Sequence, residues 1–231
     1  MARRLVVAAI AICLSLAAKA PKAALPVVTD ERVEFAAGGA IEVTGSVGEL
    51  NIEGWDGPGV RITVTRSTFG ADTPRDRDVA QRRLRAIKVT AESKGPGRLS
   101  IHTAIPARGF WSKVAQRRPN VQLDYRIRVP RDSNLALRHG SGDVLVYDVA
   151  GDIDVSVSKG DIVLQLPAAG AYAFDAQCGL GGIYSDFTGQ YRAGNLVGER
   201  FAQSAPAPAK QVRLRVGVGG IAIQKTALAT M

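Results

Sequence analysis

The chain has 231 residues, of which 46% are hydrophobic and 22% are charged. These proportions are typical of a folded domain and exclude a disordered chain, and the 6% of aromatic residues predicts an aliphatic core. The formal net charge of +9 falls to +5 if the four basic residues of the amino-terminal segment are removed, which is too small an excess to indicate a nucleic-acid-binding protein.

The first 23 residues have the pattern of a secretory signal peptide. Arg3 and Arg4 precede an apolar run from Leu5 to Leu16, and small residues follow as cleavage candidates. The alternative, a membrane anchor, needs a longer apolar run of about 20 residues. We therefore expect an exported protein, periplasmic or at the cell surface, in which residues 24–231 form a single domain. Cys178 is then the one remaining cysteine, so no internal disulfide is expected, and it should be a small buried hydrophobe.

After a short linker, residues 32–64 alternate apolar and polar side chains in three runs, each opened by a glycine. Alternation with a period of two predicts β-strands. The residues expected to face inward are Ile41, Val43, Leu50, Ile52, Ile62 and Val64.

An excursion at about residues 71–120 differs in composition. Its charged first part predicts an amphipathic helix over about 76–87, capped by Asp76 or Asp78. Residues 89–105 predict two strands around a turn at 94–97. The excursion ends in a basic loop with two aromatic residues at 107–120.

The clearest strand covers 121–130, and the stretch that follows, 135–166, is organised by glycines nine residues apart. Each of Gly142, Gly151 and Gly160 is followed by aspartate and then by aliphatic residues at alternate positions. Glycine tolerates positive φ, and aspartate can bond its own local backbone, so each pair predicts a tight turn. A fixed short period predicts stacked units that bury a shared core, made here by Val144, Val146, Ile153, Val155, Ile162 and Leu164.

The fold predicted from this pattern is all-β: a β-solenoid, or β-helix-like stack of short strands growing in one direction, plus one short helix. A meander of hairpins in a β-sandwich is the structural alternative. The number of units in each coil stays open. Beyond residue 167, two looser strands near 172–174 and 182–184 and two final strands at 212–216 and 220–223 complete the chain.

An exported chain with a strand ending in Val129-Pro130, repeated Gly-Asp-Val/Ile units and a final Gly-Gly-Ile-Ala-Ile resembles the bacterial family of putative adhesins. Members of that family are domains of unknown function that are themselves predicted β-solenoids. The resemblance covers about Val33 to Lys225. It implies an envelope or surface location and a binding or scaffold role, and it offers no catalytic residues.

Several groups of residues are candidate sites. Asp143, Asp152 and Asp161 recur at one repeat position, and a stack of like charges could hold Ca²⁺, although turn formation is the favoured role. If a coil holds two nine-residue units, Asp143 should stack on Asp161. The run His139-Gly140-Ser141-Gly142-Asp143 is interpreted as a turn and not a catalytic triad. No catalytic residue, metal or cofactor is predicted.

The most suggestive exposed patch is the basic loop, whose cations and rings could bind an anionic polymer. Its candidate residues are Arg108, Phe110, Trp111, Lys113, Arg117 and Arg118.

The leading functional hypothesis is a non-enzymatic, adhesin-like binder or scaffold at the bacterial envelope, with an envelope component or a glycan as partner and with edge-to-edge self-association as a further option. One alternative is a polysaccharide-active β-helix enzyme, which needs clustered carboxylates and a basic residue in a groove. The other is an anionic-polymer binder acting through the loop at 107–120.

Overall fold

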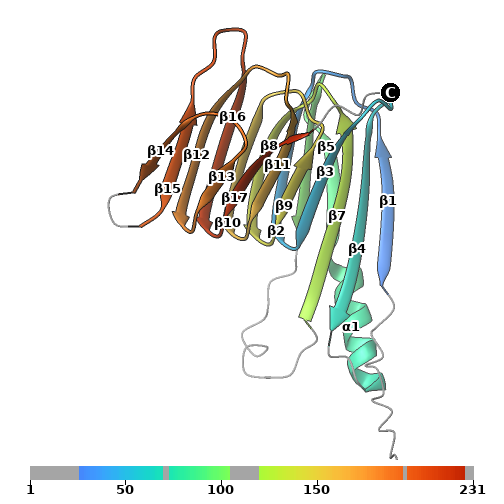
Figure 1. Ribbon diagram of the computed structural model, residues 1–231. Helices are drawn as coiled ribbons and strands as arrows, with labels where there is room; N and C mark the ends of the chain where they lie inside the picture. The colour runs from blue at the N-terminus through green and yellow to red at the C-terminus, as the bar shows by residue number, and fades with distance from the viewer. Residues whose placement is uncertain (1–25, 70–72, 105–119, 195–196, 227–231) are drawn as a thin grey trace, which may run out of the picture.

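The computed structural model describes residues 26–69, 73–104, 120–194 and 197–226. These residues form two β-sheets and one α-helix, so the prediction of an all-β fold is confirmed (Figure 1). Both sheets contain parallel and antiparallel pairs, and neither closes on itself. The predicted signal peptide and the basic loop lie outside the described residues. Within the described ranges, no helix has the length and apolar character needed to cross a membrane.

Sheet A has eight strands. Their spatial order is β1 (Val27–Val33), β4 (Val60–Phe69), β7 (Asn120–Pro130), β3 (Glu49–Trp55), β9 (Val144–Tyr147), β11 (Ile162–Pro167), β17 (Ile221–Thr226) and β13 (Ile183–Ser185).

Sheet B has nine strands. Their spatial order is β14 (Gln190–Ala193), β15 (Glu199–Gln203), β12 (Tyr172–Leu180), β16 (Lys210–Val218), β10 (Ile153–Lys159), β8 (Asn134–Ser141), β2 (Ala40–Val47), β6 (Arg98–Ala104) and β5 (Lys88–Ser93).

The middle of each sheet is parallel, and its strands alternate between the sheets along the chain. Six strands of sheet B, namely β2, β6, β8, β10, β12 and β16, are each followed by a strand of sheet A. In the stretch that organises the sequence, Leu135 pairs with Ile153 and Val144 pairs with Ile162, an offset of 18 residues in both sheets. A meander of hairpins is therefore wrong for this stretch, because hairpins pair antiparallel.

Antiparallel strands flank the parallel region at both ends. β1 and β4 continue sheet A beyond β7, β5 ends sheet B beside β6, and β15 and β14 end it beside β12. Of these, β1 was expected as linker and β14 and β15 were not foreseen. β1 and β14 lie at sheet edges and are mostly exposed, so they lack the apolar alternation that identifies the other strands.

The order of strands differs from growth in one direction along the chain. β16 and β17 lie between earlier strands: β16 between β10 and β12, and β17 between β11 and β13 (Figure 1). One edge of β12 pairs antiparallel with β15. The other edge, on the side of β10, is therefore free to pair with β16. The final strands therefore complete the middle of the molecule.

The core lies between the sheets and is built by strict alternation. All twelve side chains predicted to face inward in residues 41–64 and 144–164 are buried, with at most 3% of their surface exposed. Burying such an aliphatic side chain contributes about 1.5–3 kcal/mol. The core is mainly aliphatic, with a cluster of rings under β12 and β15 formed by Tyr172, Phe174, Phe187 and Phe201.

The predicted helix exists as α1 (Pro74–Ala86) and packs against β4. Its cap is Thr73 and not Asp76 or Asp78: the Thr73 Oγ1 accepts a hydrogen bond from the backbone N–H of Asp76 at 3.1 Å. Proline at the first helical position reinforces this start. Leu84 is fully buried, as expected for the apolar side of an amphipathic helix.

Glycines form a column at one corner of the parallel stack. Gly142 and Gly160 have φ of 123° and 137°. A Cβ on Gly160 would lie 2.2 Å from the carbonyl oxygen of Gly142, and a Cβ on Gly142 would lie 2.0 Å from that of Gly48. Glycine is thus required at both positions for two reasons: the positive φ, and the close approach of the backbone at the equivalent turn beside it. Gly151, at the opposite corner, is not among the glycines with positive φ, and close approach to Ser133 explains it.

The aspartates of the same stretch bond between rungs instead of within their own turn, which corrects the prediction. The Asp143 Oδ1 accepts the backbone N–H of Asp161 at 2.9 Å, and the Asp161 Oδ1 accepts that of Gly220 at 2.6 Å. Asp143 thus stacks on Asp161 at one corner while Asp152 lies at the other. Each carboxylate meets a backbone donor of the next rung, which offsets the repulsion between the stacked charges.

The glycine column predicts a difference between two substitutions. Gly160→Ala and Gly95→Ala both place alanine at positive φ, a strain of about 1–3 kcal/mol. Gly95 has open space around it, whereas Gly160 meets the Gly142 carbonyl. We expect Gly160→Ala to lose about 1–3 kcal/mol more of the free energy of unfolding, because overpacking adds to the strain. Denaturant titration of both variants measures this, and equal losses would contradict the column.

The edge strand β1 predicts an acid-sensitive contact. Hydrogen bonds from the Arg61 guanidinium and the Thr63 hydroxyl lower the pKa of Asp30 from 3.8 to about 2. A lowered folded-state pKa stabilises the fold above about pH 3.8, and this contribution is lost as pH falls toward 2. We expect Arg61→Gln to move the Asp30 carboxyl titration, followed by NMR, upward toward 3.8. An unchanged midpoint would show that Arg61 does not hold it.

Candidate binding surface on sheet B

The outer face of sheet B carries polar side chains in rows that run across its strands. Because parallel strands pair in register, outward residues of neighbouring strands lie side by side. One row contains both signs of charge and is called here the mixed-charge row: Ser100, Glu42, Ala136, Asp154, Arg213 and Asp175.

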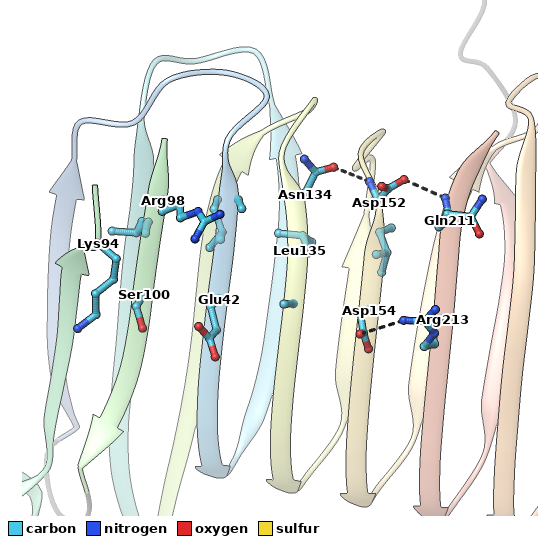
Figure 2. Close-up of a pocket in the computed structure, with 15 residues that line it drawn as sticks. Glu42, Lys94, Arg98, Ser100, Asn134, Leu135, Asp152, Asp154, Gln211 and Arg213 are labelled. Atoms are coloured by element: carbon cyan, nitrogen blue, oxygen red, sulfur yellow. Dashed lines mark hydrogen bonds and ion pairs between the residues drawn. The ribbon is translucent and has the colours of Figure 1, made fainter. Parts of the chain in front are cut away.

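A hollow of about 710 Å³ opens on this face where the rows contain alanine. Ala40 and Ala136 are outward residues of β2 and β8, and their short side chains leave the space uncovered. We call it the alanine hollow. The polar residues that line it are Glu42, Lys94, Arg98, Ser100, Asn134, Asp152, Asp154, Gln211 and Arg213 (Figure 2).

A chain of hydrogen bonds fixes one rim of the hollow. The Asn134 Oδ1 accepts the backbone N–H of Asp152, and the Asp152 Oδ1 accepts the backbone N–H of Gln211, both at 2.9 Å (Figure 2). Asn134, Asp152 and Gln211 each directly precede one of three residues that pair in register, Leu135, Ile153 and Val212. Their hydrogen bonds thus repeat the pattern made by Asp143 and Asp161 at the opposite corner. The rim is therefore held in place before any ligand arrives.

Two charged side chains of the hollow stay available. Among the described residues, neither Glu42 nor Arg98 forms a side-chain hydrogen bond or ion pair. Asp154, by contrast, is held by Arg138 at 3.0 Å and by Arg213 at 3.7 Å. Figure 2 shows Arg98 reaching over β2, the strand that carries Glu42. The hollow thus offers a free carboxylate and a free guanidinium on a rigid floor.

This arrangement suits the binding of a hydroxyl-rich ligand better than catalysis. Donors and acceptors line one open hollow, and a ligand with many hydroxyls can bond both. Glycoside hydrolysis needs two carboxylates free to act as acid and base or nucleophile. Here Asp152 is engaged by the Gln211 N–H and Asp154 by two arginines, which leaves Glu42.

The hollow is formed by residues other than those predicted as a site, and the predicted residues are not tested. Arg108, Phe110, Trp111, Lys113, Arg117 and Arg118 lie outside the described residues. The hollow was missed, and the signal that could have found it is alanine at the outward positions of two strands that pair in register.

The other candidate clusters have structural roles. Asp143, Asp152 and Asp161 each bond backbone of the next rung, and the described residues contain no group of three or more side chains suited to a metal. The interpretation of residues 139–143 as a turn is wrong for its first part, since β8 continues to Ser141. His139 is buried and its Nε2 lies 2.8 Å from the Gly48 carbonyl oxygen.

Cys178 is a buried thiol, as predicted, with 4% of its surface exposed. Its Sγ lies 2.9 Å from the carbonyl oxygen of Gly219. Burial, followed by the nearby Glu199 carboxylate, raises the pKa of the thiol. Such a thiol favours its neutral form and packs as a small apolar side chain.

Comparison with known proteins gives a likeness of fold. No protein-family model and no curated protein matches the chain. The solved structure of a putative cell adhesion protein from Clostridium sporogenes superposes with a TM-score of 0.50 at 14% identity, over 87% of this chain and 100% of that one. Two putative adhesins superpose with lower TM-scores: one from Bacteroides fragilis (0.33; 11% identity; 86% of this chain, 97% of that one) and one from Parabacteroides distasonis (0.27; 13%; 87% and 97%). The first of these likenesses shows a shared architecture.

The hydrogen-bonded rim predicts the effect of changing Asp152. Asp152→Ala removes the acceptor of the Gln211 N–H and should lower the free energy of unfolding by about 1 kcal/mol, whereas Asp152→Asn keeps an acceptor oxygen and should lose less. Asp132→Ala, at an exposed turn position, is the matched control and should change little. Denaturant titration compares the three, and identical values for Asp152→Ala and Asp152→Asn would contradict the role of the side chain.

Proposed function

We propose that this protein is an exported, non-enzymatic binding or scaffold module of the adhesin type, acting at the bacterial cell envelope. The observation that carries the proposal is the outer face of sheet B, where a rigid, wide array of polar side chains surrounds the alanine hollow. A likeness in fold to a putative cell adhesion protein supports the same role. The ligand we propose for the hollow is an envelope glycan, because its lining offers both donors and acceptors.

We further propose that the fold is a two-sheet solenoid in which two nine-residue units make one coil. The 18-residue offsets of β8 with β10 and of β9 with β11 support this description. Each coil would have two corners. One is formed by the glycine column, and at the other the side chains of Asn134 and Asp152 accept backbone hydrogen bonds. Such a stack presents outward residues at regular spacing, which suits a ligand that itself repeats.

Export rests on the signal peptide predicted for residues 1–23. The absence of internal disulfides expected for the mature chain is compatible with any compartment, so it adds nothing to this assignment. Periplasmic and cell-surface locations fit the proposed role equally, and fractionation of cells expressing the full chain separates them.

The enzymatic alternative has one observation in its favour, the three carboxylates and three cations lining the alanine hollow. It is the weaker proposal because two of those carboxylates are engaged. The anionic-polymer alternative through residues 107–120 remains a separate proposal. Arg117→Glu with Arg118→Glu should abolish heparin retention if that loop binds, and unchanged retention would contradict it.

Binding to an array of bacterial envelope glycans tests the proposed function. Residues 24–231 should bind at least one glycan, and Ala136→Ile, which fills the hollow without changing charge, should weaken that binding at least about tenfold, equivalent to about 1.4 kcal/mol. Ala173→Ile is the matched control, since Ala173 lies outward on β12 outside the hollow.

Two results would count against the proposal: no binding to any envelope glycan, or equal binding by the two isoleucine variants. Release of new reducing ends from the bound glycan, lost in Glu42→Gln, would favour the enzyme instead.

A further inference from the structure

Four arginines lie in one row across the outer face of sheet B, next to the mixed-charge row. The register of five adjacent pairs sets this arginine row, which runs through Arg138 (β8), Ser156 (β10), Arg215 (β16), Gln177 (β12), Arg200 (β15) and Arg192 (β14). Neighbouring strands are about 4.8 Å apart, so Arg138, Arg215 and Arg200 follow one another at intervals of about 10 Å. Two uncharged polar side chains, Ser156 and Gln177, fill the intervals.

Two carboxylates of the mixed-charge row hold three of these four arginines in place. Asp154 pairs with Arg138 at 3.0 Å. Asp175 pairs with Arg200 at 3.0 Å and with Arg215 at 2.5 Å. Burial raises the pKa of Asp175, but the hydrogen bonds and charge of Arg215 and Arg200 outweigh it and hold that pKa below its usual range. The guanidinium groups are thereby oriented in advance, which lowers the entropy that a ligand must overcome.

Arg138 and Arg200 are more exposed than the carboxylates that pair with them, whereas Arg215, with 31% of its side chain exposed, is not. The side chains of Arg138 and Arg200 are 48% and 51% exposed, against 32% and 34% for Asp154 and Asp175. Arg192 is exposed, and its side chain has no ion-pair partner among the described residues. With Arg213 included, five arginines face two carboxylates, so the surface keeps an excess of positive charge.

A lane of small residues runs alongside the arginine row. Gly140, Ser158, Gly217 and Gly179 occupy the next outward positions of β8, β10, β16 and β12. A hollow of about 810 Å³ opens over Ser158, Gly217 and Gly179 and is bordered by Arg192, Arg200 and Arg215. The one carboxylate in its lining, that of Glu199, accepts the backbone N–H of Ile183. A chain molecule can therefore approach the backbone of the sheet while its charged groups face the guanidiniums.

We propose that the arginine row and its lane bind a linear acidic polysaccharide, with the sugar carboxylates on the arginines and the sugar hydroxyls on Ser156, Ser158 and Gln177. Arginine forms paired, charge-assisted hydrogen bonds with carboxylates, and the intervening polar side chains match a neutral part of each repeat. This site is distinct from the alanine hollow, although it rests on the proposed binding function.

A polysaccharide fits this surface better than a single-stranded nucleic acid. Proteins that bind single strands combine a basic groove with aromatic rings on which the bases stack. Tyr191 and Phe201, the nearest rings on β14 and β15, stand at the opposite phase of those strands and contact each other. The described side chains of the arginine row and the lane include no aromatic residue, so bases would find hydrogen-bonding cations but no stacking platform.

Binding of residues 24–231 to polygalacturonate, a linear polyuronate, tests the proposal, with its fully methyl-esterified form as the neutral counterpart. We expect binding to the acid form alone, weakened by raising the salt from 50 to 200 mM. Arg192→Gln combined with Arg200→Gln should weaken it at least about tenfold. Asp175 keeps Arg215 as a partner in that variant, so the fold is preserved. Ser158→Ile should also weaken binding, by filling the lane without changing charge.

Arg32→Gln combined with Arg126→Gln removes the same charge from sheet A and is the matched control. Equal weakening by both pairs would overturn the site in favour of general charge attraction, and equal affinity for single-stranded DNA of matched length would overturn the assignment of a polysaccharide. Absence of polyuronate binding, with glycan-array binding that responds to Ala136→Ile, would overturn this inference and leave the proposed function standing. Absence of both would overturn both.

Discussion

The parallel part of both sheets depends on hydrogen bonds between a backbone N–H at one turn and a carboxylate at the equivalent turn beside it. Parallel strands bond to each other along their lengths, but the corners between the sheets leave backbone N–H groups that no strand partner reaches. Asp143, Asp152 and Asp161 accept those donors. Each bond fixes the height of one corner above the next, and the glycine column allows the corners to approach that closely. The same contacts set the register in which all outward residues are aligned.

Because outward residues of neighbouring strands are aligned, they form continuous surface features, which we propose as binding sites. Ala40 and Ala136 make a hollow because β2 and β8 bring them to neighbouring positions, and the arginines make a row because five adjacent pairs are in register. A slip of one residue in any strand would turn its outward side chains to the core. The register of the strands therefore determines the surface as well as the core. It allows short polar side chains on the strands to form a binding site that contains no loop.

The sequence predicted those parts of the fold that depend on local pattern. Alternation in residues 41–64 and 144–164 located the buried side chains, because one face of each strand must be apolar. The position of β16 between β10 and β12 could not be predicted, since it depends on which edge of β12 is already paired. The alanine hollow was missed for a related reason: Ala40 and Ala136 are far apart in the chain, and only the register of β2 with β8 joins them. Thr73 capped the helix in place of the aspartates because Pro74 fixes the first turn just after it.

The late insertion of β16 and β17 has a consequence for how the molecule is made. During synthesis, β10 and β12 emerge with a space between them, and the same is true of β11 and β13. Neither sheet is continuous until residues 210–226 have been made, since β16 begins at Lys210 and β17 ends at Thr226. A chain that lacked residues 210–226 would leave four strand edges unpaired in the middle of the sheets, one each on β10, β12, β11 and β13. We therefore expect both sheets to close together, in one late step that needs residues 210–226.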